Sequence, residues 1–228
     1  MKLIFVHGSG CFGEMWRYQT LAFPEAEAID LPGHPQGWPQ LSVAGYSEWL
    51  HDYIQGRGYS DLVLCGHSLG GGIVLQYALS YPQELAGLIL VGTGARLRVH
   101  PQYIAELVAA SRDASSWAQD MEERYRLVDP AFRRDVIRKR LEVGPAVQIV
   151  DMLCCHHFDV MDRLPQIKVP TLVICGSLDD MTPPKYSHYL HDHIAGSRLV
   201  QVDGATHHVF MERPQEVNSA IARFLAEI

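Results

Sequence analysis

Residues 62–72 read LVLCGHSLGGG, and this stretch decides the fold. Its first four residues form an apolar run that predicts a strand, and residues 69–80 have the apolar spacing of a helix. Between them, Gly66-His67-Ser68-Leu69-Gly70 has the form G-x-S-x-G, which is typical of a tight strand-to-helix turn. Because glycines let the backbone make such a turn, the Ser68 hydroxyl is expected to project at the carboxyl edge of a sheet.

Short apolar runs recur on both sides of this stretch and alternate with longer amphipathic segments. Nearly continuous apolar runs of this length suit strands that are buried on both faces, as in a parallel sheet. We therefore expect an α/β fold, with a mostly parallel sheet of about six strands and helices on both faces. The predicted strands cover residues 3–6, 26–29, 62–65, 88–91, 171–175 and 198–202, and the clearest helices cover 42–55, 69–80 and 213–227.

One segment interrupts this alternation. Residues 97–164 contain no strand-like run but several helix signals, among them Asp129-Pro130, in which the proline fits the first helical position after an aspartate cap. We interpret the segment as an insertion of about four helices that covers one edge of the sheet as a lid. The predicted domains are a core of residues 1–96 and 165–228 and a helical cap of residues 97–164.

The composition limits the class of protein. The chain has 228 residues and a formal net charge of −7, and it has no lysine- and arginine-rich run that would indicate a nucleic-acid partner. Its five cysteines lack the spacing of a disulfide scaffold. The N-terminal apolar stretch is too short for a signal peptide, and no run of about 18 apolar residues predicts a membrane span. We expect a cytoplasmic protein.

The serine in the tight turn is a candidate nucleophile. A serine hydroxyl needs a base to accept its proton, and the base needs a carboxylate that orients it. Two later predicted strands end in such residues, in the order acid and then histidine. Since the carboxyl ends of parallel strands meet at one edge of a sheet, we expect these side chains near Ser68. The candidates are Asp179 or Asp180 as the acid and His207 or His208 as the base.

Motifs around these residues resemble those of the α/β-hydrolase superfamily, along nearly the whole chain. Members typically read G-x-x-D followed by proline and, further on, G-x-G-H followed by glutamate and proline. This chain has Gly176-Ser177-Leu178-Asp179 before Pro183, and Gly204-Ala205-Thr206-His207 before Glu212-Arg213-Pro214. Thr206 stands where the family often has glycine. This difference restricts the backbone conformations that the turn can adopt but leaves the histidine in place.

The resemblance implies a catalytic triad of Ser68, Asp179 and His207. Asp180 and His208, each one residue away, are the competing assignments. Adjacent side chains point in different directions, so each pair offers one catalytic residue and one bystander. The family's motif spacing favours Asp179 and His207.

An oxyanion hole needs two backbone N–H groups that point at the developing negative oxygen. One is expected from Leu69, the residue after the nucleophile. The resemblance implies that the other is the N–H of Ser9, in the loop after the first strand, with Gly10 as the alternative. In this family the residue at His7 supports that loop and is not a base. Residues 30–34, Asp-Leu-Pro-Gly-His, resemble a turn of the family that we interpret as structural.

Two groups of residues contain possible metal ligands. Cys154-Cys155-His156-His157 lies on a predicted helix, where neighbouring side chains do not converge on one ion, so packing within the cap is the better interpretation. His188, His191 and His193 form a second group, which an exposed polar helix face explains. The glycine-rich segments lack the dinucleotide-binding and P-loop patterns. We predict no metal and no organic cofactor.

The resemblance implies a serine hydrolase that acts through an acyl-enzyme. Some of the apolar and aromatic side chains of the predicted lid are expected to line a pocket, and most to pack between its helices; they are Tyr103, Ile104, Leu107, Trp117, Met121, Tyr125, Leu153 and Phe158. With Phe12, Met15 and Trp16 near the oxyanion loop, they favour a carboxylesterase that acts on small-to-medium apolar esters. Ser68 argues against relatives that use aspartate in this turn, such as haloalkane dehalogenases and epoxide hydrolases. The alternatives with the same residues are a thioesterase, a lactonase, a hydroxynitrile lyase and a C–C bond hydrolase, and a non-catalytic ligand-binding relative is the alternative of another class. The expected partner is a small-molecule ester, and the oligomeric state stays open.

Overall fold

The computed structural model describes the backbone of residues 1–228 and every side chain except those of residues 114 and 116. Over the backbone so described, one sheet contains six strands, all parallel, in the order β2-β1-β3-β4-β5-β6. The predicted α/β fold with about six strands is confirmed. The strands are β1 (Lys2–Val6), β2 (Glu27–Ile29), β3 (Leu62–His67), β4 (Leu85–Val91), β5 (Thr171–Gly176) and β6 (Arg198–Val202).

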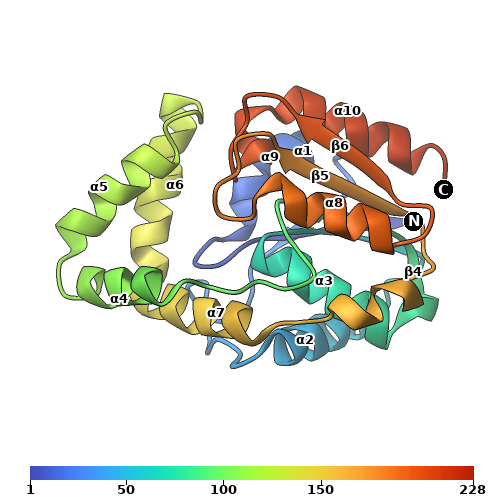
Figure 1. Cartoon of the computed structure of the whole chain (residues 1–228), viewed down its shortest axis with the longest axis horizontal. Coiled ribbons are helices and arrows are strands. Elements are labelled where there is room, and N and C mark those ends of the chain that lie inside the picture. The colour runs from blue at the N-terminus through green and yellow to red at the C-terminus, as the bar shows by residue number, and fades with distance from the viewer.

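Helices cover both faces of the sheet because successive strand residues point to opposite sides. In β1, Ile4 and Val6 pack into one buried cluster, and Leu3 and Phe5 pack into another. The first cluster includes residues of α2 (Val43–Arg57), α3 (Leu69–Ser80) and α8 (Pro184–His193), and the second includes residues of α9 (Val209–Glu212) and α10 (Pro214–Leu225). Figure 1 shows α2 and α3 below the sheet, and α1 (Arg17–Ala22) and α10 above it.

Between β4 and β5 the chain leaves the sheet and forms a run of helices. Figure 1 shows α4, α5 and α6 beyond one end of the sheet, opposite the end where both termini lie. Asp129 caps α6 as predicted, because its side chain accepts hydrogen bonds from the N–H groups of Ala131 and Phe132. That residues 97–164 form a separate cap domain stays a prediction. The helices are α4 (Pro101–Ala110), α5 (Ala114–Arg124), α6 (Pro130–Val143) and α7 (Pro145–His157), followed by the 3-10 helix η3 (Met161–Gln166).

Two shorter 3-10 helices, η1 (Gly13–Trp16) and η2 (Pro82–Glu84), directly precede α1 and β4. The cysteines at positions 11, 65, 154, 155 and 175 are buried free thiols. Of the helices that the structure describes, none is both long enough and apolar enough to cross a bilayer.

Candidate active site

Ser68 occupies the tight turn between β3 and α3, as the sequence predicts. Its backbone has φ 53° and ψ −117°, in the left-handed half of conformational space that residues other than glycine rarely adopt. The turn requires glycine on both sides of the serine. A Cβ on Gly66 would lie well within 3.0 Å of the Gly70 carbonyl oxygen, and a Cβ on Gly70 would lie as close to the Val6 carbonyl oxygen.

Hydrogen bonds to β4 and the segment after it fix this turn. The Ser68 N–H donates to the Val91 carbonyl oxygen at 3.0 Å, and the Thr93 hydroxyl donates to the Ser68 carbonyl oxygen at 2.7 Å. The serine lies at the carboxyl end of the sheet, where it lines two cavities of about 290 and 20 Å³. These are called the larger and the smaller cavity below.

Asp179 follows β5, His207 follows β6, and the fold brings the two side chains together. The Nδ1 of His207 lies 2.9 Å from Oδ2 and 3.1 Å from Oδ1 of Asp179. Thr182 donates two further hydrogen bonds to the carboxylate, one from its N–H at 2.9 Å and one from its hydroxyl at 2.8 Å. Burial by itself would raise the pKa of Asp179, but the charge and hydrogen bond of His207, with the bonds from Thr182, lower it. The carboxylate therefore stays ionised and can orient the imidazole.

The adjacent residues have different surroundings. Asp180 is exposed to solvent, next to the larger cavity. His208 is buried, with its ring centroid 4.5 Å from that of Tyr125. Burial, and then the neighbouring charge of His207, lowers the pKa of His208 well below its ordinary value, so this ring is neutral. The structure thus pairs His207, and not its neighbour, with Asp179.

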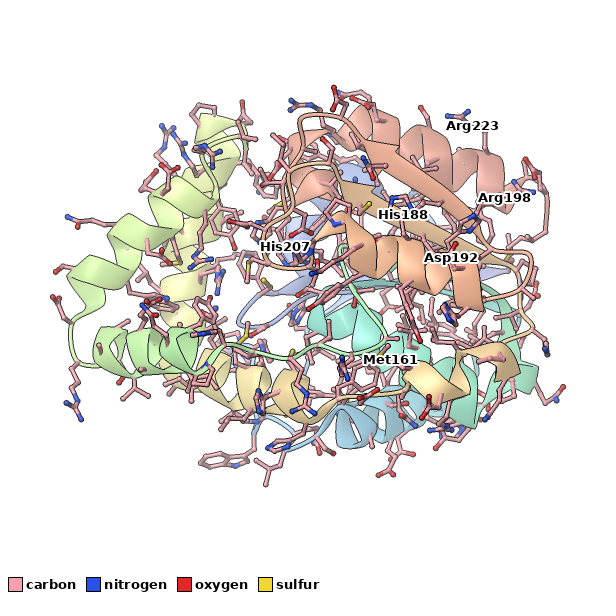
Figure 2. The ribbon with its side chains drawn as sticks, in the orientation of Figure 1. Met161, His188, Asp192, Arg198, His207 and Arg223 are labelled. Carbon is pink, nitrogen blue, oxygen red and sulfur yellow. The ribbon has the colours of Figure 1, made fainter. Side chains whose placement is uncertain are left out.

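His207 and Ser68 face the same space. Figure 2 shows His207 at the end of the sheet that faces α4, α5 and α6. Both residues line the smaller cavity, together with Ser9 from the loop after β1. Ser9, Ser68 and His207, which follow β1, β3 and β6, therefore lie around one cavity.

The loop after β1 is held from both sides. His7 accepts a hydrogen bond from the Leu31 N–H at its Nε2, 3.0 Å away, in line with the supporting role that the resemblance implies. From α7, the fully buried carboxylate of Asp151 accepts the Gly10 N–H at 2.8 Å. The same carboxylate accepts hydrogen bonds from His34 Nε2 at 2.9 Å and from the Tyr46 hydroxyl at 2.8 Å. One carboxylate thus joins α7 to the loop that carries Ser9 and to α2.

Replacing Asp151 by alanine is expected to lower the free energy of unfolding by about 3 kcal/mol or more. The change leaves three buried donors, from Gly10, His34 and Tyr46, without their acceptor. Urea denaturation, followed by circular dichroism, measures the effect. Asp162→Ala is the matched control, because this residue is exposed at the start of η3, and it should change stability by less than about 1 kcal/mol. Equal losses in the two variants would contradict the role given to Asp151.

Several residues around Ser68 were not selected from the sequence. Arg124, Arg140, Gln148 and Met152 line the smaller cavity, and no local motif marks any of them. Of the large side chains in residues 97–164, Tyr103 on α4 lines both cavities. Others have a different place: Trp117 and Met121 are buried in a hydrophobic cluster, and Leu153 is exposed.

The histidine and cysteine groups have ordinary surroundings. Cys154 and Cys155 belong to a buried hydrophobic cluster, and Cys155 also lines the larger cavity. The His156 Nδ1 lies 3.1 Å from the carbonyl oxygen of Val99. His188, labelled in Figure 2 on α8, lies 3.2 Å from the side-chain oxygen of Gln201. Among the described residues, no group of three or more histidine, cysteine, aspartate or glutamate side chains has a geometry that could hold a metal ion.

Proteins of known sequence and structure resemble this chain along its length. The pimeloyl-[acyl-carrier protein] methyl ester esterase of Neisseria meningitidis serogroup C is 27% identical over an aligned length of 232 residues, and the alignment covers 94% of this chain and 89% of that protein. The esterase of the same name from Aeromonas hydrophila is 27% identical over an aligned length of 241 residues, and the alignment covers 98% of this chain and 94% of that protein.

Solved structures give the same result. One, described as a thermophilic esterase, is 30% identical with a TM-score of 0.81, over 99% of this chain and 89% of that one. The malate-bound esterase of Thermogutta terrifontis is 26% identical with a TM-score of 0.86, over 100% of this chain and 90% of that one. A sequence model of the alpha/beta hydrolase family matches residues 3–220. With its six-stranded parallel sheet and its serine in the strand-to-helix turn, the chain belongs to the alpha/beta hydrolase family.

Proposed function

We propose that the protein is a serine hydrolase of carboxylic ester bonds, with Ser68 as nucleophile, His207 as base and Asp179 as the acid that orients it. One observation carries the proposal. Ser68, in its strained turn, shares a cavity with His207, whose Nδ1 lies 2.9 Å from the Asp179 carboxylate. The similar proteins named above are esterases, which supports an enzyme of the ester-hydrolase class.

The proposed reaction has two halves. His207 takes the proton of the Ser68 hydroxyl as its oxygen attacks the ester carbonyl, and Asp179 stabilises the imidazolium that forms. His207 then gives the proton to the leaving alcohol, and an acyl-enzyme remains on Ser68. In the second half, water attacks the acyl-enzyme with the same histidine as base, which releases the acid and restores the serine.

Two backbone N–H groups are proposed to bind the oxyanion, those of Leu69 and Ser9. Leu69 is the first residue of α3, so its N–H has no partner within the helix. For the second donor, the hydrogen bond from Gly10 N–H to Asp151 favours Ser9 over Gly10, because the Gly10 N–H is already engaged. Loss of one such donor typically lowers the rate by about 10² to 10³.

The larger cavity supports a small-to-medium ester. It has a volume of about 290 Å³, next to Ser68, and its walls include the apolar side chains of Leu97, Val99 and Met152. A cavity of this size lies near the lower end of the range of ligand sites. We therefore propose a carboxylesterase for short acyl or alcohol groups, with thioesters and lactones as the alternative substrates for the same residues.

A series of 4-nitrophenyl esters from acetate to decanoate tests this proposal. We expect kcat/KM to be highest at a short or intermediate chain and to fall by roughly 10-fold or more at decanoate, because the added methylenes exceed the larger cavity. Phenyl thioacetate and γ-butyrolactone, assayed in parallel, separate the alternative substrates. A rate that rises steadily to decanoate would contradict the assigned pocket, and no turnover of any ester, thioester or lactone would contradict the proposed function.

A further inference from the structure

The smaller cavity contains a buried cation that the proposed reaction does not use. Arg140, on α6, is only 3% exposed. Its Nη1 donates to the Tyr125 hydroxyl at 2.7 Å, and its Nη2 donates to the Gln148 side-chain oxygen at 2.6 Å. Among the described side chains, no carboxylate forms a salt bridge with this guanidinium, and its Nε has no hydrogen-bond partner. Arg140 is therefore a buried charge whose only partners are neutral.

Such a group is hard to explain by stability. A guanidinium keeps its charge at every pH at which a protein stays folded. Removing a charge from water costs free energy that two neutral hydrogen bonds do not restore, so buried charges are normally paired with an opposite charge. The unpaired Nε of Arg140 shows that its hydrogen-bonding capacity is not exhausted within the chain. We therefore look to a bound ligand for the anion that would pair with Arg140.

The whole cavity is positively charged. Its described lining includes Arg140 and Arg124 and contains no carboxylate. The Nε of Arg124 lies 2.5 Å from the carboxylate of Asp120, which does not line this cavity, so that ion pair leaves no negative group inside. Burial lowers the pKa of His67, which also lines the cavity, to about 3, so this ring is neutral. An anion that entered would meet two guanidinium groups and no carboxylate in the described lining.

Arg140 also lies beside the loop that carries Ser9. A Cβ on Gly10, which has φ +60°, would come within 2.9 Å of the Arg140 Nη2. The guanidinium is thus in contact with the backbone next to the proposed oxyanion donor. Gln148, which holds it, donates in turn to the Tyr103 hydroxyl at 3.1 Å, and Tyr103 lines both cavities. These contacts fix the cation beside the loop that carries Ser9, the proposed oxyanion donor.

We propose that the smaller cavity is an anion subsite, in which Arg140 and Arg124 bind a free carboxylate on the acyl part of the ester substrate. This rests on the proposed function, since it assigns the substrate class of the same site. The cavity, at about 20 Å³, is little larger than the 10–15 Å³ that one water needs, so it can take only a small group, such as the carboxylate at the end of a short acyl chain. Ser68 lines both cavities, so the alcohol part extends into the larger one.

Two esters that differ only at the end of the acyl chain test this inference. Monoethyl succinate carries a carboxylate where ethyl butanoate carries a methyl group. In the wild-type enzyme we expect kcat/KM for monoethyl succinate to equal or exceed that for ethyl butanoate, measured by pH-stat titration. In Arg140→Met the ratio of the two values should fall about 10- to 100-fold, as expected for the loss of a charge-assisted contact. Arg140→Lys, which keeps the charge, should retain part of the preference.

Arg138→Met is the matched control. Arg138 lies on the same helix, is 60% exposed and pairs with Glu142, so both esters should be hydrolysed as by the wild type. If both esters lose activity equally in Arg140→Met, the arginine acts on the chemistry or the fold, and the subsite is wrong. The wild type alone also tests the inference, whether or not the variant folds: a kcat/KM for monoethyl succinate below about one hundredth of that for ethyl butanoate overturns it.

Calorimetric titration with succinate separates the subsite from the proposed reaction. In Ser68→Ala, which cannot form an acyl-enzyme, succinate should still bind, and binding should weaken at least about 10-fold in Ser68→Ala/Arg140→Met. Binding that depends on Arg140 in a protein that hydrolyses no ester would keep the subsite and reject the proposed function. Absence of succinate binding, with active hydrolysis of ethyl butanoate, would reject the subsite and keep the proposed function.

Discussion

Ser68→Ala is expected to lower kcat for 4-nitrophenyl butanoate by about 10⁴- to 10⁶-fold while the protein stays folded. The loss is this large because the acyl-enzyme cannot form without the hydroxyl, so only the oxyanion donors and substrate binding remain to accelerate direct attack by water. The fold should survive, because alanine keeps the Cβ and the backbone contacts of the turn to Val91 and Thr93 are unchanged.

Steady-state kinetics and circular dichroism measure both parts of this prediction. Ser80→Ala is the matched control. Ser80 is an exposed residue at the C-terminal end of α3, the helix that follows Ser68, and the variant should keep wild-type activity. A Ser68→Ala protein that retains more than about a tenth of the wild-type kcat would show that another group is the nucleophile.

Asp179→Asn is expected to lower kcat by about 10⁴-fold. The asparagine amide can hold His207 in the wrong tautomer, and it cannot stabilise the imidazolium that forms when the histidine takes the serine proton. Thr182 donates one hydrogen bond to each oxygen of the carboxylate. An asparagine has only one side-chain oxygen, so it cannot accept both bonds, and the site is therefore specific for a carboxylate.

Asp180→Asn is the comparison that decides between the two acids. Asp180 is exposed and outside the pair with His207, so kcat should stay within about 10-fold of the wild type. Both variants are assayed on the same ester under the same conditions. A greater loss in Asp180→Asn than in Asp179→Asn would exchange the two assignments.

The sheet could be predicted from the sequence because its signals are local. Residues 198–202 were predicted as a strand and form β6 with those limits, and the helix predicted over 69–80 is α3. The less accurate limits have local causes too. β4 begins at Leu85, three residues before the predicted start, because Gly87 interrupts the apolar run. β3 extends through Gly66 and His67, since the tight turn begins only at Ser68.

The candidate site could be predicted only where a strand end carries it. Ser68, Asp179 and His207 each follow a strand, and the parallel order brings strand ends to one edge. Their roles stay proposals, but their proximity followed from chain order. Arg140 and Asp151 were missed for the opposite reason. They lie within α6 and α7, between β4 and β5, and only tertiary packing of these helices brings them to the loop after β1.

The central claim is that Ser68 is the nucleophile, and a fluorophosphonate tests it most directly. Such a reagent forms a stable phosphorus–oxygen bond to an activated serine and releases fluoride. Mass spectrometry of the treated protein should show one adduct per chain, and peptide sequencing should locate it on Ser68. Prior labelling should abolish ester hydrolysis, and Ser68→Ala should form no adduct. An adduct on a different residue, or full hydrolysis of esters by protein whose Ser68 is labelled, would contradict the account.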